Sequence, residues 1–445
     1  MERRPFPALS LLLILFAAIH GILLVHDALN PGAIFAGDRV GSRIEKIEMV
    51  ADALNNGQPV TPILIEKGDP GDYLYHAVVF SVSGKWGVII VQILLMGLGG
   101  IFLFRLVDLA FKSEKLAGIT TLVFFLLPGS LYHPHSVTSE GLANPLMIIY
   151  AFLLVRLFSE RSRKYSQLVL LGLLATILSS LRLIYVLYPV VTFGLLIWDK
   201  QAHRLVPSSV FLLVAMTLPG IWISLYHSET GELSYGPSDH SLDSNIRGRL
   251  RRMSQFDDGV TIEEPGNSAV YQLVSESVSH PGAFLKSALT DMSNMLFNSG
   301  VNTVAGRYLG VYEMPTDRSY WAEIRDREGP FAMFLHIFKQ SRSMVAANVV
   351  FGIAWVLFFL LSVYGLFLLA RMKSVDSYIR FTLISLPIYF CLLSLSASGV
   401  RWDMRTPFEF VLCIGFILTI FLRTSENALE WKPDAIRGPW RGTPR

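Results

Sequence analysis

Long apolar runs, separated by short polar connections, fill most of the chain. A helix needs about 20 residues to cross the hydrocarbon core of a bilayer, and ten stretches reach or approach that length. They are Pro7–Val25, Trp86–Phe111, Leu116–Tyr132, Leu142–Phe158, Leu168–Leu181, Leu183–Trp198, Val206–Tyr226, Val349–Leu369, Phe381–Ser396 and Pro407–Leu422. The fifth and sixth are short and also fit one bent hairpin around Arg182. The pattern predicts an all-α polytopic membrane protein with about ten transmembrane helices.

The short connections on one side of these stretches are all basic. They contain Lys112 and Lys115; Arg161, Arg163 and Lys164; Lys200 and Arg204; Arg371 and Lys373; and Arg423 at the start of the tail. Because Lys and Arg concentrate in cytoplasmic loops, we expect both termini in the cytoplasm. The first apolar stretch is longer than the core of a usual signal peptide, so a retained signal anchor fits better than a cleaved signal.

This topology divides the chain into four parts. They are an N-terminal membrane module, 1–226, with a first outer loop, 29–73; a large extracytoplasmic segment, 227–347; C-terminal transmembrane helices, 348–422; and a cytoplasmic tail, 423–445. The segment 227–347 contains 15 Asp and Glu and 11 Lys and Arg, a net charge of −4, whereas the whole chain has a net charge of +3. This asymmetry agrees with an outer location for that segment.

Each outer segment contains an amphipathic stretch. Gly41–Gly57 has apolar residues on one helical face and ends in Asn55, Asn56 and Gly57, which predicts a juxtamembrane helix that stops there. His280–Phe297 also has apolar residues at helical spacing, with Asp291 among the polar residues between them. It fits an interfacial helix on the outer leaflet, and it fits a helix of a small soluble cap as well.

Composition excludes a soluble organisation. A chain of 445 residues has room for about three soluble domains, but 52% of its residues are hydrophobic and only 16% are charged. Soluble domains have about 25% charged residues. Cys391 and Cys413 both lie inside apolar runs, so they form neither a disulfide framework nor a metal site. The net charge of +3 is too small to indicate nucleic acid as a partner.

Charged residues gather beside the apolar stretches on the predicted outer side. They are Asp38, Glu140, Arg182, Arg401 and Arg405. A charge near the bilayer is costly unless it is paired, so two acids and three arginines at similar depth indicate one external cavity. Arginine binds phosphate oxygens in pairs, and a carboxylate can deprotonate a hydroxyl. This combination suits transfer from an anionic lipid carrier.

Each of these residues also has a structural interpretation. Asp38 and Glu140 can cap helices, Arg182 can reach the outer headgroups, and Arg401 and Arg405 can anchor to lipid or pair with Asp403. Two further patterns leave a ligand role open: His133 and His135 with Glu140 as metal ligands, and Asp69 with Asp72 as a turn or as a donor or metal site. Neither pattern supplies a complete ligand set.

Four segments together resemble the GT-C superfamily of glycosyltransferases that use polyprenyl-phosphate sugars. They are Asp38 followed by GSRIEKIEMVADALNNG; the stretch from YLYHAVVFSVSGKW through LYHPHSVTSEGLANPL, which contains Glu140; the arginine of SLRLIYVLYP; and RWDMRTP before the last apolar stretch. The resemblance covers about 34–198 and the last two apolar stretches. It is similar in particular to the protein O-mannosyltransferase, aminoarabinose transferase and rhizobial galacturonosyltransferase group.

The resemblance implies the roles of individual residues. Asp38 would be the general base or would orient the acceptor nucleophile, and Glu140 would assist at the sugar or help to hold a divalent metal. Arg405, with Arg401 and Arg182, would bind the donor phosphate. His133 and His135 are further candidates for substrate binding. This sequence departs from the family at Arg39, where many members have a second acid, so only Asp38 is carried over.

The resemblance also implies the reaction and its place. A sugar would pass from a polyprenyl-phosphate donor to a lipid, glycan or protein acceptor, with inversion at the anomeric carbon, at the outer face of a bacterial inner membrane. Two other classes stay open. An O-antigen polymerase or ligase has arginines in its large outer loop, as NIRGRLRRM has here, and a transporter or flippase has repeats and charged broken helices at mid-membrane. No such repeat is visible, and the long first outer loop favours the transferase.

Overall fold

The structure is a computed structural model that describes residues 7–30, 38–67, 70–159, 165–198, 205–231, 235–236, 242–262, 269–297, 300, 304, 307–308, 342–396 and 402–423. Every element formed by these residues is a helix, and no strand occurs among them. The predicted all-α class is therefore confirmed. The predicted tail, 423–445, lies outside the described residues except for Arg423.

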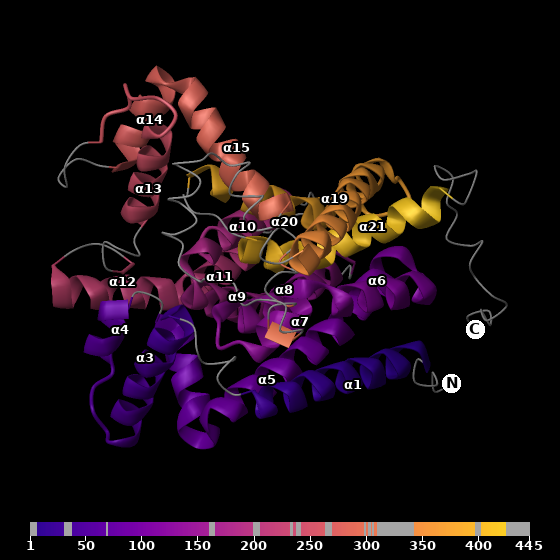
Figure 1. The fold of residues 1–445 in the computed structure, drawn as a ribbon, viewed down its shortest axis with the longest axis horizontal. Coiled ribbons are helices and arrows are strands. Elements are labelled where there is room, and N and C mark those ends of the chain that lie inside the picture. The colour runs from indigo at the N-terminus through magenta and orange to yellow at the C-terminus, as the bar shows by residue number, and fades with distance from the viewer. Residues whose placement is uncertain are drawn as a thin grey trace.

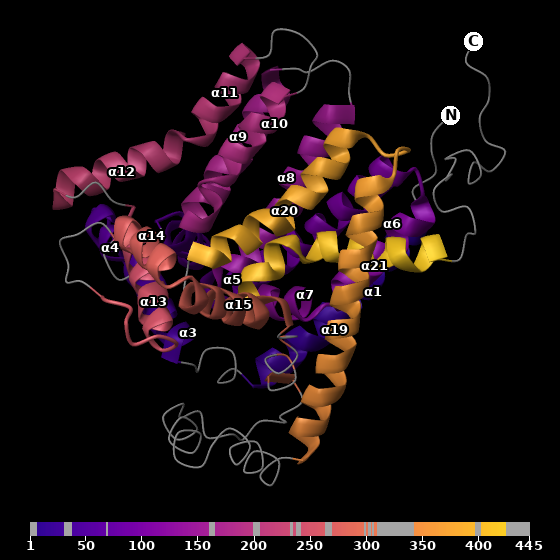
Figure 2. The same ribbon diagram turned by 90° about the horizontal axis from the view of Figure 1, so that it is seen from above.

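The N-terminal module is a succession of helices. They are α1 (Pro7–Leu29), α3 (Asp38–Asn55), α4 (Thr61–Lys67), α5 (Pro70–Phe111), α6 (Glu114–Leu126), α7 (Pro128–Tyr132), the 3-10 turn η1 (His133–His135), α8 (Ser139–Ser159), α9 (Tyr165–Leu181), η2 (Leu183–Tyr185), α10 (Tyr188–Trp198), α11 (Leu205–Ala215) and α12 (Thr217–Thr230). The helices α9, α10 and α11 lie side by side (Figure 2). Arg182 lies at the junction between α9 and η2.

The second half of the chain contributes a middle group and a C-terminal group. The middle group is α13 (Leu242–Ser254), α14 (Ala269–Ser279) and α15 (Pro281–Phe297), and the C-terminal group is α19 (Arg342–Arg371), α20 (Ser377–Ser396), η3 (Trp402–Phe408) and α21 (Glu409–Arg423). In Figure 1 the first turn of α1 and the last turn of α21 lie at the same end of the molecule, and α3 and α4 lie at the other end.

Fewer crossings are evident than the ten expected. In the described part of the chain four helices are long and apolar enough to cross a membrane: Ala8–Leu29, Pro70–Phe111, Ser139–Ser159 and Val349–Arg371. Two bent pairs raise the number to six: α6 with the α7–η1 segment, at 62°, and α11 with α12, at 44°. The other expected ranges fall on shorter helices, namely α9, α10, α20 and α21. The chain is thus an α-helical membrane protein of several spans.

Proline and glycine explain the interruptions. Leu127, which precedes Pro128, is extended at ψ 146° because proline disfavours the helical region for the residue before it. The helix α11 ends at Ala215, four residues before Pro219. Proline has no N–H to donate to the carbonyl oxygen of Ala215, and its ring clashes with that carbonyl group. Gly84 has φ 64°, which kinks the 42-residue α5 at a position that only glycine adopts readily.

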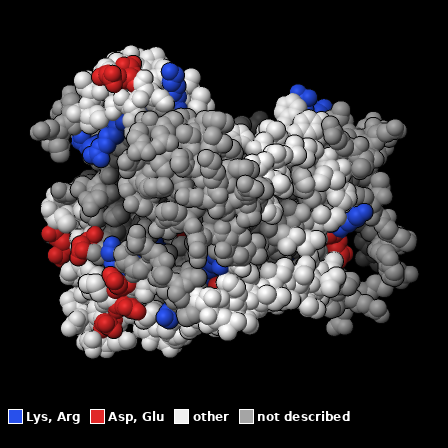
Figure 3. All heavy atoms as spheres, in the orientation of Figure 1, with Lys and Arg blue, Asp and Glu red and all other residues white. Residues whose placement is uncertain are grey.

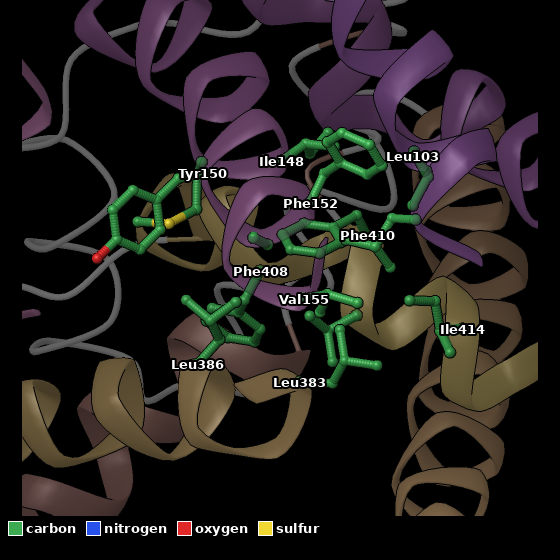
Figure 4. Packing of buried hydrophobic residues seen from close by; sticks show 14 of the residues in the cluster. Leu103, Ile148, Tyr150, Phe152, Val155, Leu383, Leu386, Phe408, Phe410 and Ile414 are labelled. Atoms are coloured by element: carbon green, nitrogen blue, oxygen red, sulfur yellow. The ribbon is translucent and has the colours of Figure 1, made fainter. Parts of the chain in front are cut away.

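The main core surrounds α8. Phe152 and Val155 of α8 pack between Leu103 of α5 and Leu383 of α20, and Phe410 at the start of α21 fills the space beside them (Figure 4). Glycine permits the closest approach of α5 to its neighbours, because a Cβ at position 100 would lie 2.1 Å from the ring of Phe125. Because α8 is packed against several helices, its first turn, which contains Glu140, has a fixed place relative to them.

Both expected amphipathic helices are present, but the second is not simply interfacial. The helix α3 ends at Asn55, as predicted, and packs on α5 through Ile47, Val50 and Ala51. The helix α15 packs against α13 and α14, and also against α20 and η3 (Figure 1). Asp291, expected on the polar face, is fully buried because it pairs with Arg249 and Arg252 of α13, at 2.9 and 2.7 Å.

Charged side chains are unevenly distributed on the surface. On the face shown in Figure 3, most described Lys, Arg, Asp and Glu lie toward the end that contains α3, α4 and α13, and a smaller group lies at the opposite end. The described surface between them is largely uncharged. This distribution agrees with a molecule embedded in a bilayer between two polar ends.

Candidate functional site

A buried ion pair joins the first turn of α8 to the end of α9. Arg182 Nη1 donates to Glu140 Oε1, and the two residues are 42 positions apart in sequence. Glu140 lies in the first turn of α8, where the helix dipole favours a carboxylate. Arg182 follows Leu181 directly, so the end of α9 places its guanidinium over that turn. Two residues that the sequence predicts for one site are thereby brought together.

A second ion pair lies beside the first, between α3 and the start of α5. Arg43 Nη2 pairs with Asp72 Oδ2. His76, one turn later in α5, has its Nδ1 3.0 Å from Asp72 Oδ1 and 2.8 Å from the Asp72 carbonyl oxygen. The Gln92 amide nitrogen is 3.0 Å from His76 Nε2 and donates to the carbonyl oxygen of Thr138 at 3.3 Å.

The two ion pairs form one polar network. Gln92 connects His76, beside the second pair, to Thr138, which contacts His133 and lies two residues before Glu140 of the first pair. We call the eight residues of this network the outer polar cluster, after the side on which the sequence predicts them: Arg43, Asp72, His76, Gln92, His133, Thr138, Glu140 and Arg182. Its members come from α3, α5, η1, α8, the residues between η1 and α8, and the junction between α9 and η2.

Two glycines hold these helix ends close together. A Cβ at Gly71 would lie 2.2 Å from the Ser180 hydroxyl oxygen, so α5 and α9 touch just before Arg182. A Cβ at Gly141 would lie 2.8 Å from the Gln92 amide and 2.9 Å from the carbonyl oxygen of His133. Larger residues at either position would separate the helices that carry the charged groups.

The carboxylates are enclosed, whereas the guanidinium groups are partly open. The Glu140 and Asp72 side chains are 7% and 1% exposed, and those of Arg182 and Arg43 are 27% and 21% exposed. The exposed part of each guanidinium presents positive charge to the accessible side of the cluster. The outer polar cluster can therefore accept an anion from the accessible side of its two arginines.

The predicted His-x-His-x4-Glu pattern is divided between two places. His133 belongs to the outer polar cluster, with its Nδ1 3.4 Å from the Thr138 hydroxyl. His135 points elsewhere: its Nδ1 is 2.8 Å from Asp27 Oδ2, and its Nε2 is 2.8 Å from His20 Nδ1. Among the described residues, no group of three or more His, Cys, Asp and Glu side chains is arranged to hold a metal ion.

Arg405 does not join Glu140 and Arg182. Its side chain is fully buried at the junction of η3 and α21, where Nε donates to Glu409 Oε1 at 3.0 Å and Nη1 donates to the carbonyl oxygen of Met295 at 2.7 Å. The guanidinium also lies 3.9 Å from the ring centroid of Trp355. This geometry resembles a structural clamp between α15, α19 and α21 more closely than an open phosphate site.

Two predicted site residues have side chains outside the described part of the structure. Asp38 is the first residue of α3, but only its backbone is described, and Arg401 is not described. Asp38 precedes Arg43 by five residues in the same helix. The helix that begins at the predicted general base is therefore the one that contributes an arginine to the outer polar cluster.

Sequence reasoning missed Arg43, His76 and Gln92, and it left Asp72 between a turn and a ligand role. A signal for the α5 residues was present, because Asp72 and His76 lie one helical turn apart and His76 is directly followed by apolar residues. Arg43 gave no such signal, because it lies among the charged residues of an amphipathic helix.

No family model, curated protein or solved structure matches this chain. Its function therefore has to be inferred from its own residues and their geometry.

Proposed function

We propose that this protein is a membrane glycosyltransferase that moves a sugar from a polyprenyl-phosphate donor to a lipid, glycan or protein acceptor. The reaction takes place on the outer face of a bacterial inner membrane. The observation that supports it best is the outer polar cluster, in which Arg43 of α3 and Arg182 after α9, both partly exposed, each pair with a buried carboxylate.

Arg182 and Arg43 suit the phosphate of the donor. A guanidinium stays charged when it is removed from water and binds phosphate oxygens in a fork. As the glycosyl bond breaks, negative charge grows on the leaving polyprenyl phosphate. Positive groups fixed in advance at that position stabilise this charge more in the transition state than in the ground state.

Asp38 and Glu140 have separate roles in the proposed reaction. The acceptor hydroxyl attacks the anomeric carbon and gives its proton to Asp38, while the bond from that carbon to the phosphate oxygen breaks and its electron pair leaves with the polyprenyl phosphate. Glu140 orients Arg182 through their ion pair, and its negative charge stabilises the positive charge that develops on the sugar. Direct displacement inverts the configuration at the anomeric carbon.

The arginine-rich segment of the outer region does not favour a polymerase or ligase. Arg249 and Arg252, two of its four arginines, both pair with the buried carboxylate of Asp291. Their charges hold α13 on α15, which is a structural task. The transferase therefore remains the better supported of the two.

The proposed topology has ten crossings and cytoplasmic termini, with the bent and short helices counted as crossings. We expect reporter fusions after Arg163 and Lys200 to give cytoplasmic signals, and a fusion near Gly259 to give an external signal. The physical reason is the excess of Lys and Arg in the connections on one side. An external signal at Arg163 would reverse the topology and place the outer polar cluster on the wrong side for a lipid donor that has already been flipped.

The proposed activity is tested most directly on lipids. A strain that lacks the protein should accumulate one polyprenyl-phosphate-linked sugar and lose that sugar from a lipid, glycan or protein, and the wild-type protein should reverse both changes. Mass spectrometry of the lipid fraction identifies the sugar. Accumulation of a pyrophosphate-linked oligosaccharide would indicate a polymerase or ligase instead, and an unchanged lipid profile would reject the proposal.

A further inference from the structure

Another buried ion pair connects the first helix to the predicted outer segment, 227–347. Asp27, in the last turn of α1, is fully buried. Arg307 lies 280 residues further along the chain, and its Nε and Nη2 donate to the two oxygens of that carboxylate at 3.1 and 3.0 Å. The Arg307 side chain is itself only 6% exposed. This is the paired arrangement in which an arginine fork binds a carboxylate most strongly.

The same guanidinium also holds the segment at the end of η1. Arg307 Nη2 donates to the carbonyl oxygen of His135 at 2.7 Å, and Nη1 donates to the Ser136 hydroxyl at 3.0 Å. His135 Nδ1 donates to Asp27 Oδ2 at 2.8 Å. We call Asp27, His135 and Arg307 the latch. It joins α1, η1 and the outer segment through side chains that are almost completely enclosed.

His20 fixes the orientation of the histidine in the latch. The rings of His20 and His135 are nearly parallel, with centroids 5.1 Å apart and an angle of 6° between their planes. In a neutral His135 ring the proton lies on Nδ1, toward Asp27, so Nε2 accepts a hydrogen bond from His20 Nδ1 at 2.8 Å. Each ring thereby has one preferred tautomer. Because His135 belongs to η1, these hydrogen bonds also hold η1 against α1.

The latch is connected to the outer polar cluster by a short, internally bonded piece of chain. Ser136 N donates to the carbonyl oxygen of His133 at 3.1 Å, and Thr138 N donates to the carbonyl oxygen of Ser136 at 2.8 Å. Gly141 N then donates to the carbonyl oxygen of Thr138 at 3.1 Å, in the first turn of α8. Glu140 is four residues beyond Ser136, so a displacement of η1 moves the carboxylate that pairs with Arg182.

We infer that the latch holds η1 in place and thereby positions the outer polar cluster. Arg307 is the residue of the predicted outer segment, 227–347, that makes this connection. Asp27 and Arg307 are positioning residues, since they act on Glu140 and His133 through η1. The effect on turnover rests on the proposed function, whereas the effect on η1 does not.

Hydrogen exchange of the backbone of residues 129–141 tests the latch on the purified full-length protein, without any substrate. Asp27→Asn and Arg307→Gln each remove the charge-assisted pair, and exchange in this segment should become at least ~10-fold faster, the factor expected for losing one such bond. Arg307→Lys should give a smaller increase, because a point charge replaces the fork. Arg251→Gln, at an exposed arginine of α13, should leave the segment unchanged.

The double variant Asp27→Asn with Arg307→Gln should exchange no faster than the quicker single variant, because both changes break one device. Unchanged exchange of residues 129–141 in both single variants, in protein that remains folded, would overturn the latch. If exchange accelerates in every latch variant but no donor turnover is found for the wild type, the latch stands and the proposed function fails. If exchange accelerates while turnover of the proposed donor stays normal, the positioning role fails.

Discussion

Glu140→Gln should reduce sugar transfer by about 100-fold to 1,000-fold, the usual result of removing one group that is positioned to stabilise a transition state. Glutamine keeps the shape of the side chain and a hydrogen bond to Arg182, but it removes the charge. Donor affinity should stay the same or rise slightly, because Arg182 no longer shares its charge with a carboxylate. The measurement is the turnover number together with the dissociation constant for the donor.

Glu114→Gln is the matched control for this variant. Glu114 also lies in the first turn of a helix, α6, but it is exposed and far from the outer polar cluster in the chain. It should have normal turnover and donor affinity. If Glu140→Gln kept near-normal turnover, or if its loss followed a large fall in melting temperature alone, Glu140 would be a helix-capping residue and its proposed role would be withdrawn.

The helical class was predictable because the signal is local. A run of about 20 apolar residues indicates a membrane helix whatever surrounds it, and α1, α5, α8 and α19 all follow this rule. The interruptions were harder to predict. Pro128 and Pro219 are visible in the sequence, but the 62° and 44° bends depend on what packs against each half. The start of α5 was missed because Ser81, Ser83 and Lys85 lower the hydropathy around the kink.

The site was predictable only where a charge interrupts an apolar run. Glu140 and Arg182 were found in this way, and the structure brings them into contact. Their partners could not be found, because pairing between Arg43 and Asp72, or between Asp27 and Arg307, is decided by how distant helices meet. A residue that looks solvated on an amphipathic helix becomes buried when its helix packs on another, as Arg43 partly does on α5.

Arg405 shows the converse case, a residue for which the sequence predicted a site role but whose contacts in the structure are structural. It lies beside the last apolar stretch, where the resemblance implies a phosphate-binding arginine. Its guanidinium is nevertheless enclosed by Glu409, Trp355 and Met295. Its position along the chain did not reveal its neighbours. The phosphate-binding role and the structural role predict different results for the same pair of variants.

Arg405→Met should lower the free energy of unfolding by about 3–5 kcal/mol, because it leaves the buried carboxylate of Glu409 without its partner. The double variant Arg405→Met with Glu409→Leu should recover most of that loss, since replacing both members of a buried ion pair by apolar residues is often neutral or stabilising. Thermal or denaturant unfolding in a fixed detergent measures both changes. Arg251→Met, at an exposed arginine of α13, should change stability by less than about 0.5 kcal/mol.

Donor binding by the double variant then separates the two roles. If Arg405 is a clamp, the double variant regains stability and donor affinity together, because the outer polar cluster does not include either residue. A double variant that is as stable as the wild type but no longer binds the donor would show that Arg405 contacts the phosphate, and the structural interpretation would be wrong. Arg182 and Arg43 would then have to share the donor with a third arginine, which requires η3 to move away from its present contact with α8. Such a movement has a visible marker, because Thr406 of η3 is held to α8 by a 3.1 Å hydrogen bond from its hydroxyl to Asn144, one turn beyond Glu140.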